Sequence, residues 1–201
     1  MKPGGKIIAI VGAPRSGKSF LAKRLVEHYG GRAFLEGEEI DFPARIKEDI
    51  TKNIRPLERV LWYRNKLVEK YRVALRHKQE GELVILDTFW VSYQLFIDAL
   101  AAGLERTLLH DVASIDIKSL GWPDLTVFLN ISERGMRKFI ALGGRSFDRS
   151  EEFIKNQALP VNTLHQKFFS RFKHRGEVFI INRGSLDFVK QRDFEKLVWM
   201  I

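Results

Sequence analysis

The sequence contains no cysteine among its 201 residues. Disulfide bonds, thiolate metal sites, iron–sulfur clusters and cysteine nucleophiles are therefore excluded. No apolar run approaches the ~20 residues that a membrane-spanning helix needs. The short apolar run near the N-terminus is not followed by a signal-peptide cleavage pattern. These absences favour a cytoplasmic protein.

The chain also lacks internal repeats, low-complexity tracts and any linker long enough to divide it. Hydrophobic residues make up 45% and charged residues 29% of the chain, a balance that is typical of a folded core and excludes wholesale disorder. We therefore expect residues 1–201 to form a single domain.

The charge is unevenly distributed. Lys and Arg number 34 against 25 Asp and Glu, a formal net charge of +9. Ten basic and four acidic residues lie within residues 130–175. Such a surplus predicts a polyanionic partner, which could be nucleic acid, an acidic membrane or a phosphorylated small molecule. The structural alternative is a solvated helical face.

Predicted strands and helices alternate along the chain. We expect strands at residues 6–11, 32–36, 82–87, 124–130 and 177–182. We expect helices at residues 18–29, 57–75, 90–102, 105–117, 132–142, 151–173 and 187–198. Asp148 and Glu151 could form a capping box at the start of the helix at 151–173. The strands are continuously apolar, which indicates a parallel sheet covered on both faces.

The predicted fold is therefore a three-layer α/β/α domain with a five-stranded parallel sheet. In such folds ligands bind beyond the carboxyl ends of the strands. The residues at those ends are Gly12, Glu36, Asp87 and Asn130.

Residues 12–19 match the phosphate-loop motif G-x-x-x-x-G-K-S in full, between a strand and a helix. The motif comprises Gly12, Ala13, Pro14, Arg15, Ser16, Gly17, Lys18 and Ser19. Its backbone N–H groups and the following helix N-terminus form an anion site. Lys18 would bind the β- and γ-phosphates, and the Ser19 hydroxyl is a suitable Mg²⁺ ligand. A nucleoside triphosphate is the predicted ligand.

Asp87 ends a buried strand that we expect beside the phosphate loop, where its carboxylate could hold Mg²⁺ together with Ser19. The alternative is an aspartate that caps the next helix.

A GTPase is disfavoured because the string at residues 65–68, NKLV, lacks the aspartate of a guanine-reading motif. A mechanical ATPase is disfavoured because Thr88, not a glutamate, follows Asp87. These features favour a kinase.

Several segments together resemble the thymidylate kinase and deoxynucleoside kinase group of P-loop kinases. They are residues 6–29, the ELVILD and TFWVS strings at 82–92, PDLTVFLNIS at 123–132, GGRSFDRSEEF at 143–153 and VFIINRGS at 178–185. The resemblance covers nearly the whole chain. It implies ATP and Mg²⁺ as cofactors and phosphoryl transfer to a nucleoside or nucleoside monophosphate. Members of this group often dimerise through helices beside the third strand, so a homodimer is left open.

The resemblance also implies roles for individual residues. Glu36 is the implied base for the acceptor hydroxyl, with Glu39 in reserve; a solvated acidic turn is the alternative. The stretch at about 133–150 would be a basic lid that closes over ATP. Its arginines are Arg137, Arg145 and Arg149, with Arg145 expected to act in catalysis and the other two to bind the nucleotide.

The residues that bind the acceptor are predicted from the apolar pattern of one helix and from one position where this sequence departs from the kinase group. The group has an arginine after the acidic residue of the third strand, where this chain has Thr88. Arg64 falls in the apolar stripe of its helix, and a buried charge needs a partner or a ligand. We expect Arg64 to face the acceptor; the alternative is that its side chain snorkels to the surface. Possible stacking partners for the acceptor base are Trp62, Tyr63 and Phe89, and core packing is the alternative for all three.

Two other functions remain open on the sequence alone. A nucleic-acid-associated P-loop ATPase could use the basic stretch at residues 151–175, and an ATP-binding module could have this fold without catalysing transfer. The sequence does not distinguish a nucleoside from a monophosphate acceptor.

Overall fold

The structure is a computed structural model, which describes residues 4–37, 41–143, 149–171 and 177–201. At its centre lies a five-stranded parallel sheet in the order β2-β3-β1-β4-β5. The strands are β1 (Lys6–Gly12), β2 (Arg32–Phe34), β3 (Leu83–Asp87), β4 (Leu125–Asn130) and β5 (Glu177–Asn182). The predicted α/β/α fold with a five-stranded parallel sheet is confirmed.

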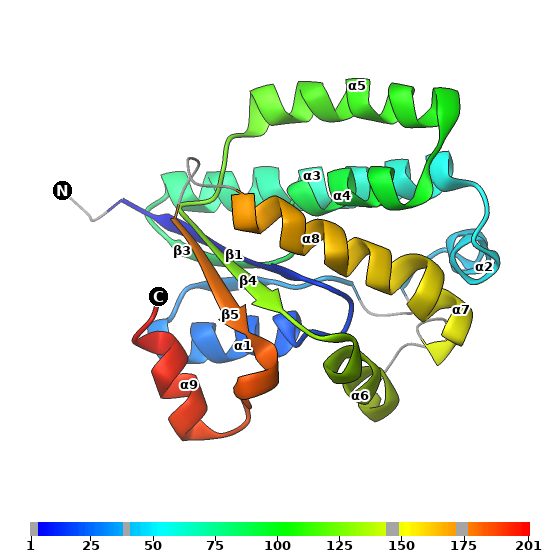
Figure 1. Ribbon diagram of the computed structural model, residues 1–201. Helices are drawn as coiled ribbons and strands as arrows, with labels where there is room; N and C mark the ends of the chain where they lie inside the picture. The colour runs from blue at the N-terminus through cyan, green and yellow to red at the C-terminus, as the bar shows by residue number, and fades with distance from the viewer. Residues whose placement is uncertain (1–3, 38–40, 144–148, 172–176) are drawn as a thin grey trace.

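Helices cover both faces of this sheet (Figure 1). One face carries α3 (Pro56–Gln79), α4 (Val91–Leu100) and α8 (Leu159–Arg171), with α5 (Gly103–Leu120) packed outside α3. The other carries α1 (Lys18–Tyr29) and α9 (Gln191–Val198). Two further helices, α2 (Ala44–Lys52) and α6 (Glu133–Gly143), lie near the carboxyl ends of the strands. In the described residues, no helix is both long and apolar enough to span a membrane.

The central strand explains why both faces must be covered. Alternate side chains of β1 point to opposite sides of the sheet. Ile7 and Val11 join the cluster that contains Tyr71 of α3, and Ile10 joins the cluster that contains Leu21 of α1. Because apolar side chains project from both faces, burying them requires two layers of helices.

The structure differs from the sequence reading at several places, one of them being the expected helix at 187–198, which begins only at Gln191. Helix α2 was not predicted. Strand β2 ends at Phe34, so Glu36 lies in the loop beyond it. The expected helix at 151–173 is divided into α7 (Glu151–Phe153), a π-helical segment (Ile154–Ala158) and α8.

Proline accounts for the division of this helix. Pro160 has no N–H to donate to the carbonyl four residues before it, and such a missing bond favours a local π-type widening. The start of the helix also differs from the expected capping box. Ser150 is the observed cap, since its side chain accepts a hydrogen bond from the Phe153 N–H at 3.0 Å. Asp148 lies outside the described residues.

Candidate active site

The phosphate loop connects β1 to α1 with the backbone that its glycines require. Gly12 has φ 151° and Gly17 has φ 97°. A Cβ on Gly12 would lie 2.8 Å from the carbonyl oxygen of Leu129, so a side chain at this position would collide with the backbone of β4. Helix α1 begins at Lys18, directly after the loop, and its N-terminus faces the same space as the loop N–H groups. Lys18 Nζ donates to the carbonyl of Ala13 at 3.2 Å.

Asp87 lies directly opposite the start of α1. The Ser19 hydroxyl donates to Asp87 Oδ2, and the Glu36 backbone N–H lies 3.4 Å from the same oxygen. Strands β1, β2 and β3 are neighbours, so their carboxyl ends bring these three residues together. A buried carboxylate facing a hydroxyl offers hard oxygen ligands, which fit Mg²⁺.

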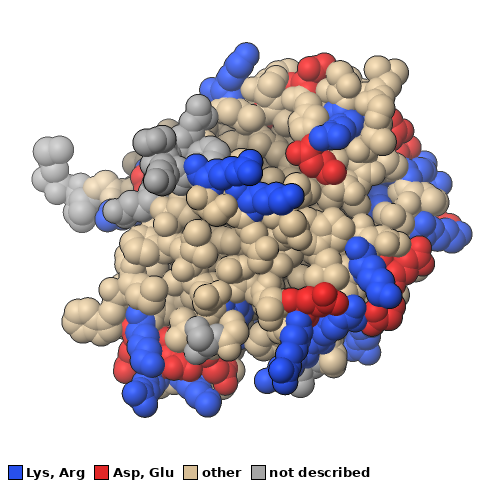
Figure 2. All heavy atoms as spheres, viewed as in Figure 1, with Lys and Arg blue, Asp and Glu red and all other residues tan. Residues whose placement is uncertain are grey.

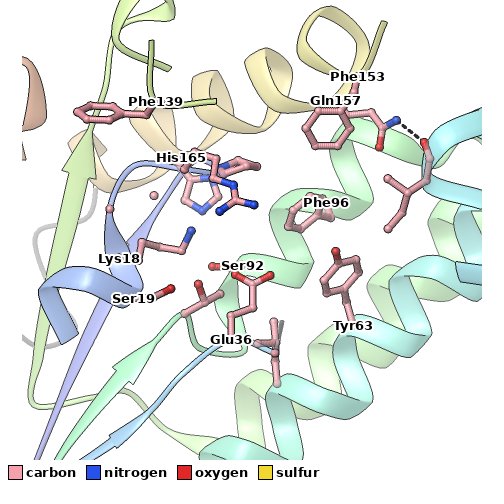
Figure 3. A pocket seen from close by; sticks show the side chains of 18 of the residues that line it. Lys18, Ser19, Glu36, Tyr63, Ser92, Phe96, Phe139, Phe153, Gln157 and His165 are labelled. Atoms are coloured by element: carbon pink, nitrogen blue, oxygen red, sulfur yellow. Dashed lines mark hydrogen bonds between the residues drawn. The ribbon is translucent and has the colours of Figure 1, made fainter. Parts of the chain in front are cut away.

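A cavity of about 540 Å³ opens beside the phosphate loop. Figure 3 shows Lys18, Ser19 and His165 on one side of it and Tyr63, Phe96, Phe153 and Gln157 on the other. The Glu36 side chain and Ser92 lie between these two groups. The cavity therefore has a cationic end at the phosphate loop, an aromatic end, and a carboxylate between them.

The aromatic end contains flat surfaces. The rings of Tyr63 and Phe96 are stacked, with centroids 5.6 Å apart and planes within 4°. Leu67 and Phe153 line the same region. A planar, partly apolar ligand could pack here with its polar edge toward the remaining wall.

That wall holds an arginine and an amide. Arg59 is buried, and its Nη2 donates to Gln157 Oε1 at 2.5 Å while its Nη1 donates to Asn53 Oδ1 at 3.0 Å. Gln157 Nε2 donates to the carbonyl of Ile50 at 2.9 Å, which fixes the amide's orientation. Burial lowers the pKa of the Arg59 guanidinium. Within the described part of the chain, Arg59 Nε has no hydrogen-bond partner.

Arg64 does not reach the cavity, so the expected acceptor contact is wrong for this residue. Its Nε and Nη2 donate to the two carboxylate oxygens of Asp116 on α5, at 2.8 and 2.6 Å. Tyr93 donates to the same carboxylate at 2.5 Å. The cavity face of α3 is instead formed by Arg59, Tyr63 and Leu67, which recur every fourth residue. Position 64 lies about 100° around the helix from Tyr63, toward α5.

Phe89 is also misassigned by the sequence reading. It is fully buried and does not line the cavity. Its ring makes edge contacts with Trp90 and Trp122, with centroids 5.6 Å apart in both cases. Phe89 therefore belongs to the core beneath α4, and Phe96 in the next turns of that helix supplies the cavity's aromatic surface.

The predicted lid is only partly described. Arg137 on α6 pairs with Glu133 at 2.8 Å and with Glu151 at 2.5 Å, so it ties α6 to the start of α7. Arg149 is exposed, and Arg145 lies outside the described residues. Lys and Arg side chains gather where Figure 1 places α6, with acidic side chains beside them (Figure 2).

Two cationic or titratable residues near the loop were missed by the sequence reading. Arg183, just after β5, donates from Nε to the carbonyl of Ser16 at 3.1 Å and stacks on Phe188 with 4.2 Å between guanidinium carbon and ring centroid. In the sequence, the position of Arg183 directly after the carboxyl end of a predicted strand could have indicated it.

His165 lines the cavity, is buried, and bonds through Nδ1 to the carbonyl of Val161 at 2.8 Å. Since that carbonyl can only accept, Nδ1 carries the proton and Nε2 is an acceptor.

Burial lowers the pKa of His165 to about 4, with the positive charge of Lys18 acting in the same direction. The imidazole is therefore neutral at pH 7. Within the described residues, its Nε2 has no hydrogen-bond partner.

Comparison with known proteins agrees with this geometry. No protein-family model matches the chain. A deoxyadenosine kinase from Lactobacillus acidophilus is 22% identical over 96% of this chain and 93% of its own length. A deoxyadenosine kinase from M. mycoides with bound dATP superposes with a TM-score of 0.75 at 16% identity, over 96% of this chain and 97% of that one. The structure of the M. mycoides enzyme with bound dCTP gives the same TM-score at 17% identity, over 96% of both chains. The predicted resemblance is thus confirmed: over nearly its whole length, this chain has the fold of the P-loop deoxynucleoside kinases.

Proposed function

We propose that the protein transfers the γ-phosphoryl group of ATP to the 5′-hydroxyl of a deoxynucleoside. One observation carries the proposal: a single cavity joins a phosphate loop, a carboxylate and an aromatic base-sized end, in that order. The similarity to deoxyadenosine kinases supports it. A nucleoside has the matching order of parts, since its hydroxymethyl group lies between the donor phosphate and its own base.

Each part of the site has a task in this reaction. Loop N–H groups and Lys18 hold the ATP phosphates, and Arg183 adds positive potential behind the loop. The Glu36 carboxylate accepts the proton of the acceptor hydroxyl as its oxygen attacks phosphorus. Ser19 and Asp87 would hold Mg²⁺, which supplies positive charge to the phosphates when bound. The basic lid at about 133–150, with Arg137, Arg145 and Arg149, completes the nucleotide site.

The polar wall of the cavity can form hydrogen bonds with the edge of a base. Arg59 and Gln157 both line the cavity, where they offer a guanidinium donor and a side-chain amide. Adenine N7 and N6 present the complementary acceptor and donor, and cytosine has an acceptor next to its N4 amino group. Because the similar deoxyadenosine kinase structures have dATP or dCTP bound, we propose deoxyadenosine and deoxycytidine as the substrates.

A product assay tests the function. Mg-ATP is incubated with the four deoxynucleosides, their 5′-monophosphates and a single-stranded oligonucleotide, and the products are separated by chromatography. We expect deoxyadenosine or deoxycytidine to give its 5′-monophosphate and an equal amount of ADP. Conversion of monophosphates alone, or ADP release stimulated only by the oligonucleotide, would overturn the proposal.

Location and assembly belong to the same proposal. ATP and nucleosides are substrates of the cytoplasm, which is where we place the enzyme. The resemblance leaves a homodimer open, and sedimentation velocity distinguishes it from a monomer.

A further inference from the structure

Lys70 lies on the face of α3 that packs against the sheet, and the proposed mechanism gives it no role. It lies on α3 between the core residues Leu67 and Tyr71. It lies three residues beyond Leu67, the last α3 residue that lines the cavity. The side chain crosses to the sheet, where Nζ donates to the backbone carbonyl of Asp87.

This hydrogen bond holds a peptide unit that is already held at its other end. The Thr88 N–H donates to the carbonyl of Ile10 on β1 at 2.9 Å. Lys70 takes the carbonyl on the opposite edge of the same peptide. Thr88 itself has φ 67°, a left-handed conformation that is costly for a threonine and persists only when its surroundings enforce it. The orientation of the Asp87 side chain toward Ser19 depends on this backbone.

The charges around Lys70 are those of the active site. Burial lowers the pKa of the Lys70 ammonium, and the nearby Asp87 and Glu36 carboxylates oppose that effect. Lys18 is close enough to act on Lys70 as a like charge. An ammonium taken out of water needs compensating acids, and here they are the two carboxylates with proposed roles in transfer.

We propose that Lys70 is a positioning residue for phosphoryl transfer. Its ammonium fixes the carboxyl end of β3 so that the Asp87 carboxylate faces Ser19, and it supplies positive charge beneath Asp87 and Glu36. This inference rests on the proposed function. It adds a residue from α3 to a centre otherwise built from the phosphate loop and the strand ends.

The first test is Lys70→Met, which keeps most of the stem and removes the ammonium. We expect kcat to fall at least about tenfold while the KM values for ATP and nucleoside change less than about twofold, because the groups that contact both substrates remain. The thermal midpoint is measured as well, because the Asp87 carbonyl loses its hydrogen-bond donor, and the kinetics are run well below that midpoint. Lys66→Met is the matched control: Lys66 is exposed one turn earlier on α3, and its loss should leave kcat unchanged.

Chemical rescue separates charge from packing. The chain has no cysteine, so Lys70→Cys introduces a single thiol, which 2-bromoethylamine converts to an aminoethyl side chain of nearly lysine length. Alkylation is done in denaturant before refolding, with wild-type protein treated in parallel. We expect the unalkylated variant to lose kcat and the aminoethylated one to regain most of it. Alkylation with iodoacetamide, which adds a neutral group, should restore nothing.

The outcomes distinguish this inference from the proposed function. Wild-type protein that phosphorylates no nucleoside overturns the proposed function and removes the basis of the inference. Active wild-type protein with unchanged kcat in Lys70→Met overturns the inference alone. Equal recovery with the neutral and the amino adduct would also overturn it, since packing would then be sufficient.

Discussion

Ser19 Oγ donates a hydrogen bond to Asp87 Oδ2, although the two residues are 68 positions apart in the chain. Ser19 lies in the first turn of α1, and Asp87 ends β3. The contact follows from sheet order, because β1 and β3 are parallel neighbours whose carboxyl ends meet. It joins the hydroxyl and the carboxylate that we propose to hold Mg²⁺.

The first prediction concerns that carboxylate. Asp87→Asn should lower kcat at least about a hundredfold, because an amide is a weaker metal ligand, although its single oxygen can still accept the hydrogen bonds of Ser19 and the Glu36 N–H. Calorimetric titration should show nucleotide affinity becoming insensitive to added Mg²⁺. Asp124→Asn is the control, since Asp124 lies at the opposite, amino-terminal end of the strands, where its carboxylate accepts a hydrogen bond from the Ile7 N–H at 2.7 Å. Retained Mg²⁺ dependence in Asp87→Asn would remove its metal role.

The second prediction concerns Lys18. Lys18→Ala should abolish measurable transfer, a loss of at least about a hundredfold, or roughly 2.7 kcal/mol of transition-state stabilisation. The thermal midpoint should change little, because the described contact of Lys18 Nζ is one hydrogen bond to the carbonyl of Ala13. Lys23→Ala, at an exposed position of the same helix, should retain full activity. An active Lys18→Ala enzyme would contradict the phosphate-loop assignment.

The sequence was sufficient for the fold and the phosphate loop because both depend on local patterns. Continuous apolar strands, a complete G-x-x-x-x-G-K-S motif and the strand-terminal Asp87 each have a short-range signature. The π-helical segment was missed, although Pro160 is visible in the sequence. This segment places Gln157 in the cavity wall. The side chain is held there by its hydrogen bond to the carbonyl of Ile50 on α2, which no local pattern indicates.

The acceptor side was harder to predict because it depends on which helix faces which neighbour. An apolar stripe shows that one face of a helix is buried, but it does not show which neighbouring element covers that face. Arg64 pairs with Asp116 of α5, and Asp116 gave no signal of its own in the sequence. Lys70 was hidden for the same reason, since nothing local indicates that it reaches the end of β3.

The third prediction is a stability effect of the Arg64–Asp116 pair. Asp116→Leu should lower the free energy of unfolding by about 3–5 kcal/mol, because it removes the acceptor of both Arg64 and the buried Tyr93 hydroxyl. Denaturant titration measures this. Asp111→Leu, at an exposed position five residues earlier on α5, is the control. A loss below about 1 kcal/mol would mean that the pair contributes no more than a surface ion pair.

The fourth prediction concerns acid stability. The unfolded chain protonates His165 near pH 6.5, but the folded chain does so only near pH 4, because burial lowers the folded pKa to about 4. Between these pH values the unfolded state binds more protons than the folded state. The contribution of His165 to the free energy of unfolding is therefore fully present above pH 6.5 and is lost as the pH falls toward 4. The loss should be about 3 kcal/mol. Relative to wild type, His165→Gln should gain stability between pH 7 and pH 4.5, and His28→Gln, at an exposed position, should not.

The last prediction contrasts two arginines of α3 through the same substitution. Arg59→Met should raise the nucleoside KM at least about tenfold, or ~1.4 kcal/mol, because the guanidinium lines the cavity and orients Gln157. Arg64→Met should leave that KM unchanged, because its guanidinium is bound to Asp116 on the far side of the helix. Both variants should keep the wild-type KM for ATP, whose phosphates bind at the other end of the cavity. Arg59→Lys should not rescue, since a lysine lacks the fork that reaches Asn53 and Gln157 together. If Arg64→Met raised the nucleoside KM and Arg59→Met did not, the acceptor would have to bind on the α5 side of α3, away from the cavity.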